Sequence, residues 1–197
     1  MSQDNQEVDM NEKLDRALCE KYPLIFRDRN APMTQTAMCW GFSHGDGWYN
    51  IIDVLCGMLY SDYRHAKVRY ENLVQWKEEG GAFPWKGGKE ITDEEVATAK
   101  AKMEEEAERI PVASQVKEKF GGLRFYVDRA SEKHYNYITF AENMSYRTCE
   151  ECGNAGTHYS FGWHQTLCDK HADERYGKEA ADYRNKMGEW SDEEEQA

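Results

Sequence analysis

Four residues toward the C-terminal end constrain this chain more than any other feature of its sequence: Cys149, Cys152, Cys168 and His171. They form the pattern C-x2-C-x15-C-x2-H, in which each pair can reach one ion from a single turn of backbone. Three thiolates and one imidazole in a tetrahedral set favour zinc. Because four protein ligands complete that set, the pattern predicts a structural zinc site rather than a catalytic one.

The surrounding residues predict a treble-clef-like unit over 147–187. Gly153 follows the first pair, where a tight knuckle needs a residue without Cβ strain. The segment between the two pairs can form a short hairpin, and the segment after the third cysteine has a helical composition. We expect the unit to pack on the rest of the chain through Tyr159, Trp163 and the helix 172–187.

Residues 112–128 alternate with a period of two and predict a β-hairpin. A turn at Gly121-Gly122 would pair Phe120 with Leu123, since glycine tolerates the positive φ of tight turns. One face of the hairpin would then be apolar: Val112, Val116, Phe120, Leu123, Phe125 and Val127. The opposite face would carry a basic and aromatic group: Lys117, Lys119, Arg124 and Tyr126.

Helical periodicity dominates the remainder of the chain. Helices are predicted over 11–20, over 48–60 with Asp46 as N-cap, over 63–77, and from Ser131 to Tyr146. Thr92 and Glu95 form a capping box that opens a charged surface helix ending before Pro111. The predicted fold class is therefore α+β, with N-terminal helices, a central β-hairpin and a C-terminal zinc unit.

The net charge of −12 is localised. Residues 1–13 hold four acids and one Lys, 89–109 hold eight acids and four bases, and 188–197 hold five acids and no base. The remaining residues hold twenty acids and twenty bases. We therefore predict a flexible acidic N-terminal tail over 1–13, a helical body over 14–146, the zinc-binding unit over 147–187 packed on that body, and an acidic tail over 188–197.

Composition excludes several classes of protein. A general nucleic-acid-coating protein needs a basic footprint, which an acidic chain lacks. No run of about 18 apolar residues is present, so no membrane helix is expected. The polar first residues lack the regions of a signal peptide, and three cysteines remain outside the zinc pattern, so we expect a cytoplasmic location under reducing conditions.

The segments GDGWYNIIDVLC, QVKEKFGGLRFYV and RTCEECG…GW…TLCDKHA together resemble small uncharacterised proteins of bacteriophages and prophages. The similarity covers roughly residues 20–175. The resemblance carries no established activity. It implies expression in the cytoplasm of a bacterial host, with a zinc ribbon or treble clef.

Three functions are compatible with these features. The first is a non-enzymatic, zinc-stabilised protein that binds a bacterial host protein, for example as an inhibitor of a host defence system. The second is a module that binds nucleic acid or another anionic ligand on the basic face formed by Lys117, Lys119, Arg124 and Tyr126. The third is a divergent HNH-like nuclease that uses His158 and His164, for which the sequence offers no matched acidic partner.

Two weaker sites involve residues of the helical body. A second metal site would need Cys39, Cys56, His44 and His65 to converge, and an acid–base cluster would combine those two histidines with Asp46 and Asp53. Neither group has a compact spacing. Oligomeric state is not readable from the sequence.

Overall fold

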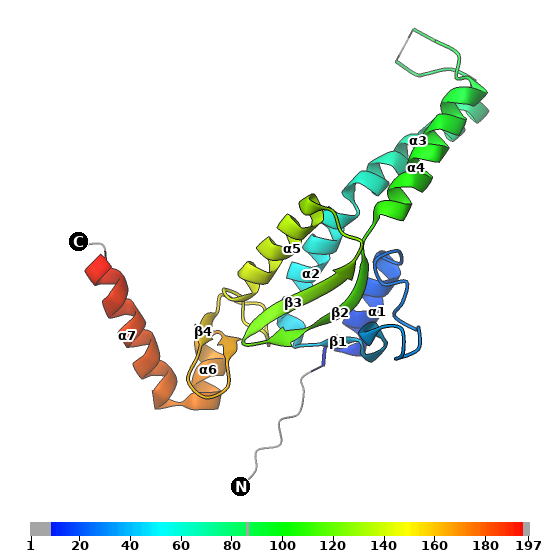
Figure 1. Cartoon of the computed structure of the whole chain (residues 1–197). Helices are drawn as coiled ribbons and strands as arrows, with labels where there is room; N and C mark the ends of the chain where they lie inside the picture. Colours follow the sequence, from blue (N-terminus) through cyan, green and yellow to red (C-terminus); the bar gives the residue numbers. More distant parts are fainter. Residues whose placement is uncertain (1–8, 86, 195–197) are drawn as a thin grey trace.

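The computed structural model describes residues 9–85 and 87–194, and its architecture is α+β, as the sequence predicts (Figure 1). The main sheet has the order β1-β2-β3, in which β1 is parallel to β2 and β3 is antiparallel to it, and β4 and β5 form a separate antiparallel pair. The strands are β1 Phe42–Ser43, β2 Val112–Lys119, β3 Gly122–Asp128, β4 Thr157–Tyr159 and β5 Gln165–Leu167. The helices are α1 Glu12–Lys21, α2 Tyr49–Leu59, α3 Ser61–Glu79, α4 Asp93–Arg109, α5 Glu132–Ser145, α6 Asp169–Tyr176 and α7 Lys178–Glu194, with 3-10 turns η1 Ala37–Trp40 and η2 Asp46–Trp48.

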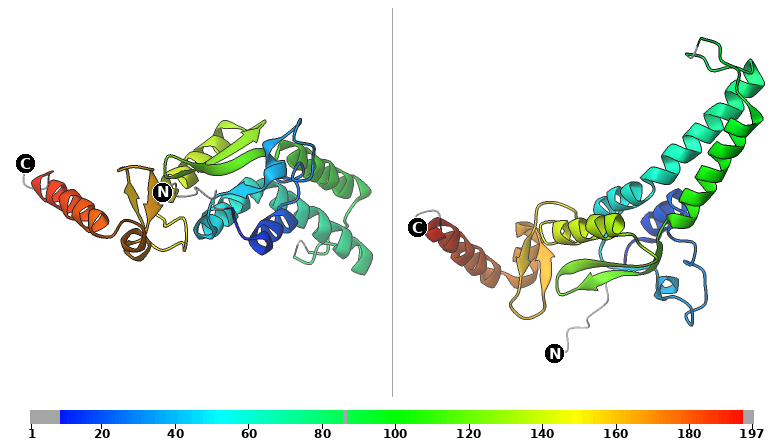
Figure 2. Two further views of the ribbon diagram at one scale, coloured as in Figure 1. Left: turned by 90° about the horizontal axis from the view of Figure 1, so that it is seen from below. Right: turned by 45° about the horizontal axis from the view of Figure 1, so that its top comes forward.

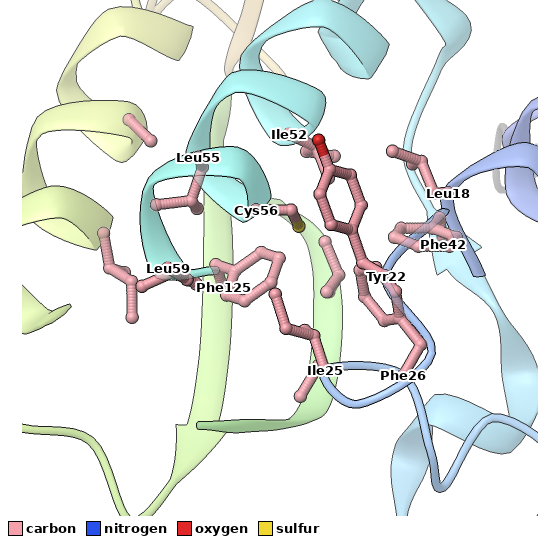
Figure 3. Close-up of a cluster of buried hydrophobic side chains, with 14 of the residues drawn as sticks. Leu18, Tyr22, Ile25, Phe26, Phe42, Ile52, Leu55, Cys56, Leu59 and Phe125 are labelled. Atoms are coloured by element: carbon pink, nitrogen blue, oxygen red, sulfur yellow. The ribbon is translucent and has the colours of Figure 1, made fainter. Parts of the chain in front are cut away.

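The main hydrophobic core lies between α1, α2 and the inner face of the sheet (Figure 3). The sheet contributes Val116, Leu123 and Phe125, which are at most 2% exposed. They pack with Ile52 and Leu55 of α2, in the same cluster as residues of α1 and its following turns. Complete burial of one such side chain contributes about 1.5–3 kcal/mol, so this face of the hairpin holds the body together.

The hairpin turn lies one residue earlier than predicted. Lys119 pairs with Gly122, so Phe120 and Gly121 form the two-residue turn, with φ of +55° and +76°. The predicted pairing of Phe120 with Leu123 is therefore wrong, and Phe120 is 62% exposed at the hairpin tip instead of buried. The second glycine has a different role, because a β-carbon at residue 122 would come within 2.6 Å of the phenol oxygen of Tyr146.

The outer edge of the sheet is covered by α5. The Leu123 N–H donates to the Ser145 hydroxyl (2.8 Å), and the Phe125 N–H donates to the Glu142 carboxylate (2.9 Å). These side chains satisfy backbone donors that an edge strand would otherwise leave unpaired. The contact fixes α5 alongside β3, as seen in Figure 1.

Residues 10–13, which were predicted to belong to an N-terminal tail, are part of the folded body. Met10 is 6% exposed in the core, and its N–H donates to the Phe42 carbonyl (3.0 Å). Asn11 caps α1, and its own N–H donates to the Asp46 carboxylate (2.7 Å). Asp46 is thus not the N-cap of the next helix as predicted, because it lies in η2 and α2 begins at Tyr49. Residues 1–8 lie outside the described part of the chain.

Helices α3 and α4 form an arm that projects from the body (Figure 2). A small cluster of Leu73, Phe83, Ile91 and Ala99 holds its distal half together. The capping box of Thr92 and Glu95 is present. The charged helix α4 lies along α3.

The C-terminal helix is broken where one helix was expected. Gly177, with φ of +54°, separates α6 from α7. The backbone of α7 continues to Glu194, so most of the predicted acidic tail 188–197 is helical, and residues 195–197 lie outside the described part. Within the described residues, no helix is long and apolar enough to cross a membrane.

Candidate metal centre

The four residues of the cysteine–histidine pattern converge in the structure. Their ligand atoms all lie within 4.8 Å of one another. His171 Nδ1 is 3.3 Å from the sulfur of Cys149 and 3.4 Å from that of Cys168, and the sulfurs of Cys152 and Cys168 are 3.7 Å apart. One metal ion can therefore contact all four donors.

A tight backbone knuckle presents the first two ligands. The Gly153 N–H donates to the Cys149 carbonyl (2.9 Å), and the Cys149 N–H donates to the Asn154 carbonyl (2.7 Å). Gly153 has φ of +76°, a conformation that glycine adopts without a Cβ penalty. The knuckle thus forms for the reason that the sequence suggests.

The other two ligands belong to the start of α6. Cys168 is the N-cap residue and His171 lies in the first turn. Burial raises the pKa of the Cys168 thiol, but the N–H groups of His171 and Lys170 and the neighbouring thiols outweigh burial, so the net shift is downward. The helix start therefore favours the thiolate that a metal needs.

A carboxylate lies behind the histidine ligand. Glu151 is 3.7 Å from His171 Nε2 and accepts a hydrogen bond from Arg175 (2.6 Å). Such outer partners fix the tautomer and orientation of a ligating imidazole. With Nε2 facing Glu151, Nδ1 of His171 faces the cysteine sulfurs. The residues present therefore fit a four-coordinate ion with sulfur and nitrogen donors.

The knuckle is held by a glycine-rich loop of the body, from which it is separated by about a hundred residues of sequence. The Gly47 N–H donates to the Glu150 carbonyl (2.7 Å), and the Gly45 N–H donates to the Glu150 carboxylate (3.1 Å). The Glu150 N–H in turn donates to the Thr166 carbonyl of β5 (2.9 Å). Burial raises the pKa of the Glu150 carboxyl to about 7.

The glycines of this loop are required by the close approach. A β-carbon at residue 47 would lie inside the contact distance of the Cys149 carbonyl oxygen and 2.5 Å from the Gly153 nitrogen. A β-carbon at residue 45 would lie 2.5 Å from the Glu150 carbonyl oxygen. Trp48 completes the contact, because its indole N–H donates to the Thr148 carbonyl (2.9 Å).

The tip of the central hairpin makes a second contact with the Cys3His unit, the name used below for residues 147–187. His158 donates from Nε2 to the Phe120 carbonyl (3.0 Å), and the Thr166 hydroxyl donates to the Gly121 carbonyl (2.6 Å). Gly121 has no room for a side chain, since its β-carbon would lie 2.6 Å from the His158 ring. The unit therefore meets the body at two places, the glycine-rich loop and the hairpin tip.

The residues predicted to mediate this packing have other positions. Trp163 is 66% exposed. Tyr159 is fully buried, but within a small core of the unit itself that includes Leu167 and Ala172. Helix α7 also packs on the unit, where Arg184 donates to the Tyr159 hydroxyl (2.9 Å). Polar backbone contacts, which hydrophobic patterning does not reveal, join the unit to the body.

The structure brings together the two histidines of the nuclease alternative. His164 Nδ1 lies 3.4 Å from His158 Nε2, which is also bonded to the Phe120 carbonyl. Among the residues that the structure describes, the Cys3His cluster is the only group of three or more His, Cys, Asp or Glu ligands that could share an ion. The pair has no carboxylate partner there with which to hold a catalytic metal.

The weaker sites in the body do not assemble. His44 is fully buried between the rings of Phe42 and Trp48, and its Nε2 is the one buried side-chain polar atom, among the described residues, without a hydrogen-bond partner. Asp53 accepts hydrogen bonds from Lys21 and the Tyr22 hydroxyl. Cys39, Cys56, His44 and His65 thus form no shared ligand group among the described residues, and Asp53 is engaged with Lys21 and Tyr22.

The basic hairpin face does form. Lys117 is opposite Arg124 in the register, and Tyr126 follows on the same side. The ammonium of Lys117 lies 5.8 Å from the centre of the Tyr126 ring. Arg124 is partly engaged, because it donates to the Tyr146 hydroxyl (2.8 Å).

Several residues of the metal centre were not identified from the sequence: Gly45, Gly47, Glu150 and Thr166. The Gly-x-Gly pattern before Trp48 was visible, but its role depends on a partner about a hundred residues away. Only the folded chain shows that a small residue is needed there.

Comparisons with protein-family models, curated proteins and solved structures gave no significant match. The Cys3His cluster and the hairpin face are therefore the features from which a function can be inferred.

Proposed function

We propose that this chain is a non-enzymatic protein, stabilised by a structural zinc ion, that binds a protein of a bacterial host. The observation that carries the proposal is the complete set of four sulfur and nitrogen donors within 4.8 Å of one another. Zinc prefers this donor set, and four protein ligands fill its usual tetrahedral coordination. Such an ion acts through folding and not through a bound water.

The position of the site explains what the ion would stabilise. Cys149 and Cys152 lie in the knuckle. Its Glu150 accepts hydrogen bonds from the glycine-rich loop of the body. Cys168 and His171 begin the helix that closes the small core of the unit. A metal bound by both pairs would therefore hold the Cys3His unit in the conformation that contacts the body.

The host-protein partner follows from the resemblance to phage and prophage proteins and from the absence of a matched carboxylate beside His158 and His164 in the described residues. Inhibition of a host defence system is one activity that such binding would serve. Bacterial cytoplasm is the corresponding location. The five acids among residues 188–197 have the charge to contact a basic partner.

The test combines metal analysis, partner isolation and a nuclease assay. We expect one zinc per chain, and a bacterial protein that forms a stoichiometric complex when both purified components are mixed. A C152S variant should lose both zinc and the complex. Metal-dependent nicking of plasmid DNA that disappears in H158A and H164A would show instead that the protein is an enzyme.

A second candidate function is binding of an anionic ligand on the basic hairpin face. It is favoured by the register, which places Lys117, Arg124 and Tyr126 on one side of the sheet. Glu118 points to the other side and accepts a hydrogen bond from the Gly121 N–H (2.5 Å). Charge reversal at Lys117 should abolish salt-dependent binding to heparin, a polyanionic probe, and unchanged binding would remove this candidate.

A further inference from the structure

The tips of two hairpins meet, and an exposed phenylalanine ring lies there beside a histidine ring. Phe120, at the tip of the β2–β3 hairpin, is 62% exposed, and its ring lies 6.1 Å from that of His164 in the β4–β5 hairpin. Trp163, the residue before His164 in the sequence, is 66% exposed. Large aromatic side chains that stay exposed where two structural units meet are typical of a binding surface.

Cations accompany these rings along the outer face of the main hairpin. Lys119 lies 5.4 Å from the centre of the Phe120 ring, and Lys117 lies 5.8 Å from that of Tyr126, which is 41% exposed. Between residues 115 and 126, the outward positions of the two strands carry three cations and no acid. Figure 1 shows the hairpin in front of α2, and the register places these side chains on the face opposite the buried Val116, Leu123 and Phe125.

We propose that this composite surface, formed by Lys117, Lys119, Phe120, Tyr126 and Trp163, binds single-stranded nucleic acid. The inference rests on the second candidate function and names its ligand class. Bases would stack on the three aromatic rings, and the two lysines would contact the phosphates that alternate with the bases along the strand. A duplex is a poorer ligand, because its base faces are already stacked.

Arg124 has a positioning role in this surface. Its guanidinium donates to the Tyr146 hydroxyl and to the Leu123 carbonyl (2.7 Å), and lies 5.7 Å from the centre of the Tyr146 ring. The Tyr146 ring in turn packs edge-on against His158, which bonds to the hairpin tip. Arg124 thus helps to hold the two hairpins together.

The Cys3His unit supplies one side of the surface. Trp163 and His164 belong to its β4–β5 loop, and the unit meets the hairpin tip through His158 and Thr166. The lysines and Phe120 belong to the body. The surface is therefore complete only when the unit is docked, so binding depends on the metal through folding.

Fluorescence anisotropy with a labelled thymidine dodecamer, measured on the full metal-loaded chain at about 50 mM salt, tests the proposal. Phe120→Asn, which keeps a residue suited to positive φ, and Trp163→Ala should each weaken binding by at least about fivefold. The double reversal Lys117→Glu with Lys119→Glu should abolish binding. Matched controls are Trp85→Ala, an equally exposed tryptophan on the arm, and Lys67→Glu with Lys170→Glu, and these should bind as the wild type.

Three results would overturn the inference. Loss of binding in the lysine variant with no effect of Phe120→Asn or Trp163→Ala would leave an anionic-ligand face but exclude stacked bases. Failure of the wild type to bind the dodecamer or heparin would exclude both this inference and the second candidate function. Displacement of the dodecamer by a polyglutamate peptide at equal concentration would identify an acidic protein as the partner.

Discussion

The backbone of Gly47 lies directly against the carbonyl group of Cys149, so that a metal-site cysteine and a loop of the body are separated by no side chain. The Gly47 N–H donates to the next carbonyl along, that of Glu150 (2.7 Å). This contact couples the body to the metal centre through backbone atoms alone. A substitution at Gly47 and removal of the metal should both disturb it.

A Gly47→Ala variant should lose at least about 2 kcal/mol of unfolding free energy, because the added carbon has no space beside the Cys149 carbonyl. Urea denaturation measures this loss. Gly57→Ala is the matched control, since it lies within α2 and its β-carbon would meet only the Tyr22 hydroxyl at 3.4 Å. That control should be neutral or more stable by about 0.5–1 kcal/mol. Equal losses in both variants would contradict the assigned contact.

Removal of the metal should open the Cys3His unit before the body. The Cys3His ligands adjoin a small core of their own, whereas the main core does not include them. Hydrogen exchange of the Gly47 N–H, which bonds to Glu150, should accelerate on chelation or in Cys152→Ser. Cys39→Ser, outside the cluster, should leave the exchange slow. Unchanged exchange after complete chelation would show that the ion has no structural role.

Ser145→Ala should destabilise the protein by about 1–3 kcal/mol, because it leaves the buried Leu123 N–H without an acceptor. Thermal unfolding gives the change. Ser61→Ala is a suitable comparison, since that hydroxyl makes only a long contact with Asp62 (3.5 Å) at the surface. It should change stability by less than about 0.5 kcal/mol. A Ser145 variant as stable as the Ser61 variant would mean that β3 has another acceptor.

The contribution of His44 to stability should fall as the pH drops from about 6.5 to about 4, whereas the Glu150 carboxyl, whose pKa burial raises to about 7, contributes in the opposite direction. Burial lowers the pKa of the His44 side chain from 6.5 to about 4. Between these pH values the unfolded chain is therefore protonated at His44 and the folded chain is not. The contribution is fully present above pH 6.5, and about 3 kcal/mol is lost once pH 4 is reached. Urea denaturation across this range should show that the unfolding free energy of the wild type decreases relative to that of His44→Phe as the pH falls. Identical slopes would exclude His44 as the cause.

The sequence was sufficient for features that depend on neighbours in the chain. The spacing of Cys149, Cys152, Cys168 and His171 predicted a cluster that the structure forms. Capping at Thr92 depends on Glu95 three residues away, and it too was predicted correctly. Period-two alternation assigned the buried side of the hairpin, apart from its tip.

Features that depend on distant neighbours were missed or misassigned. Two adjacent glycines indicated a Gly-Gly turn, but Tyr146 occupies the space beside Gly122 and the turn moves to Phe120-Gly121. Asp46 had the right position for an N-cap, yet it accepts from Asn11, a residue outside its helix. In each case a steric or hydrogen-bond partner far along the chain outweighs the local preference.

The separation of 105 residues between Gly45 and Glu150 also sets an order for biosynthesis. When the glycine-rich loop leaves the ribosome, the knuckle that will cover it has not been made. The loop cannot make this contact until Glu150 has been made, and the four donors of the cluster are complete only once His171 has emerged. Docking of the Cys3His unit is therefore a late event in folding, which requires that the chain has been translated through the cluster.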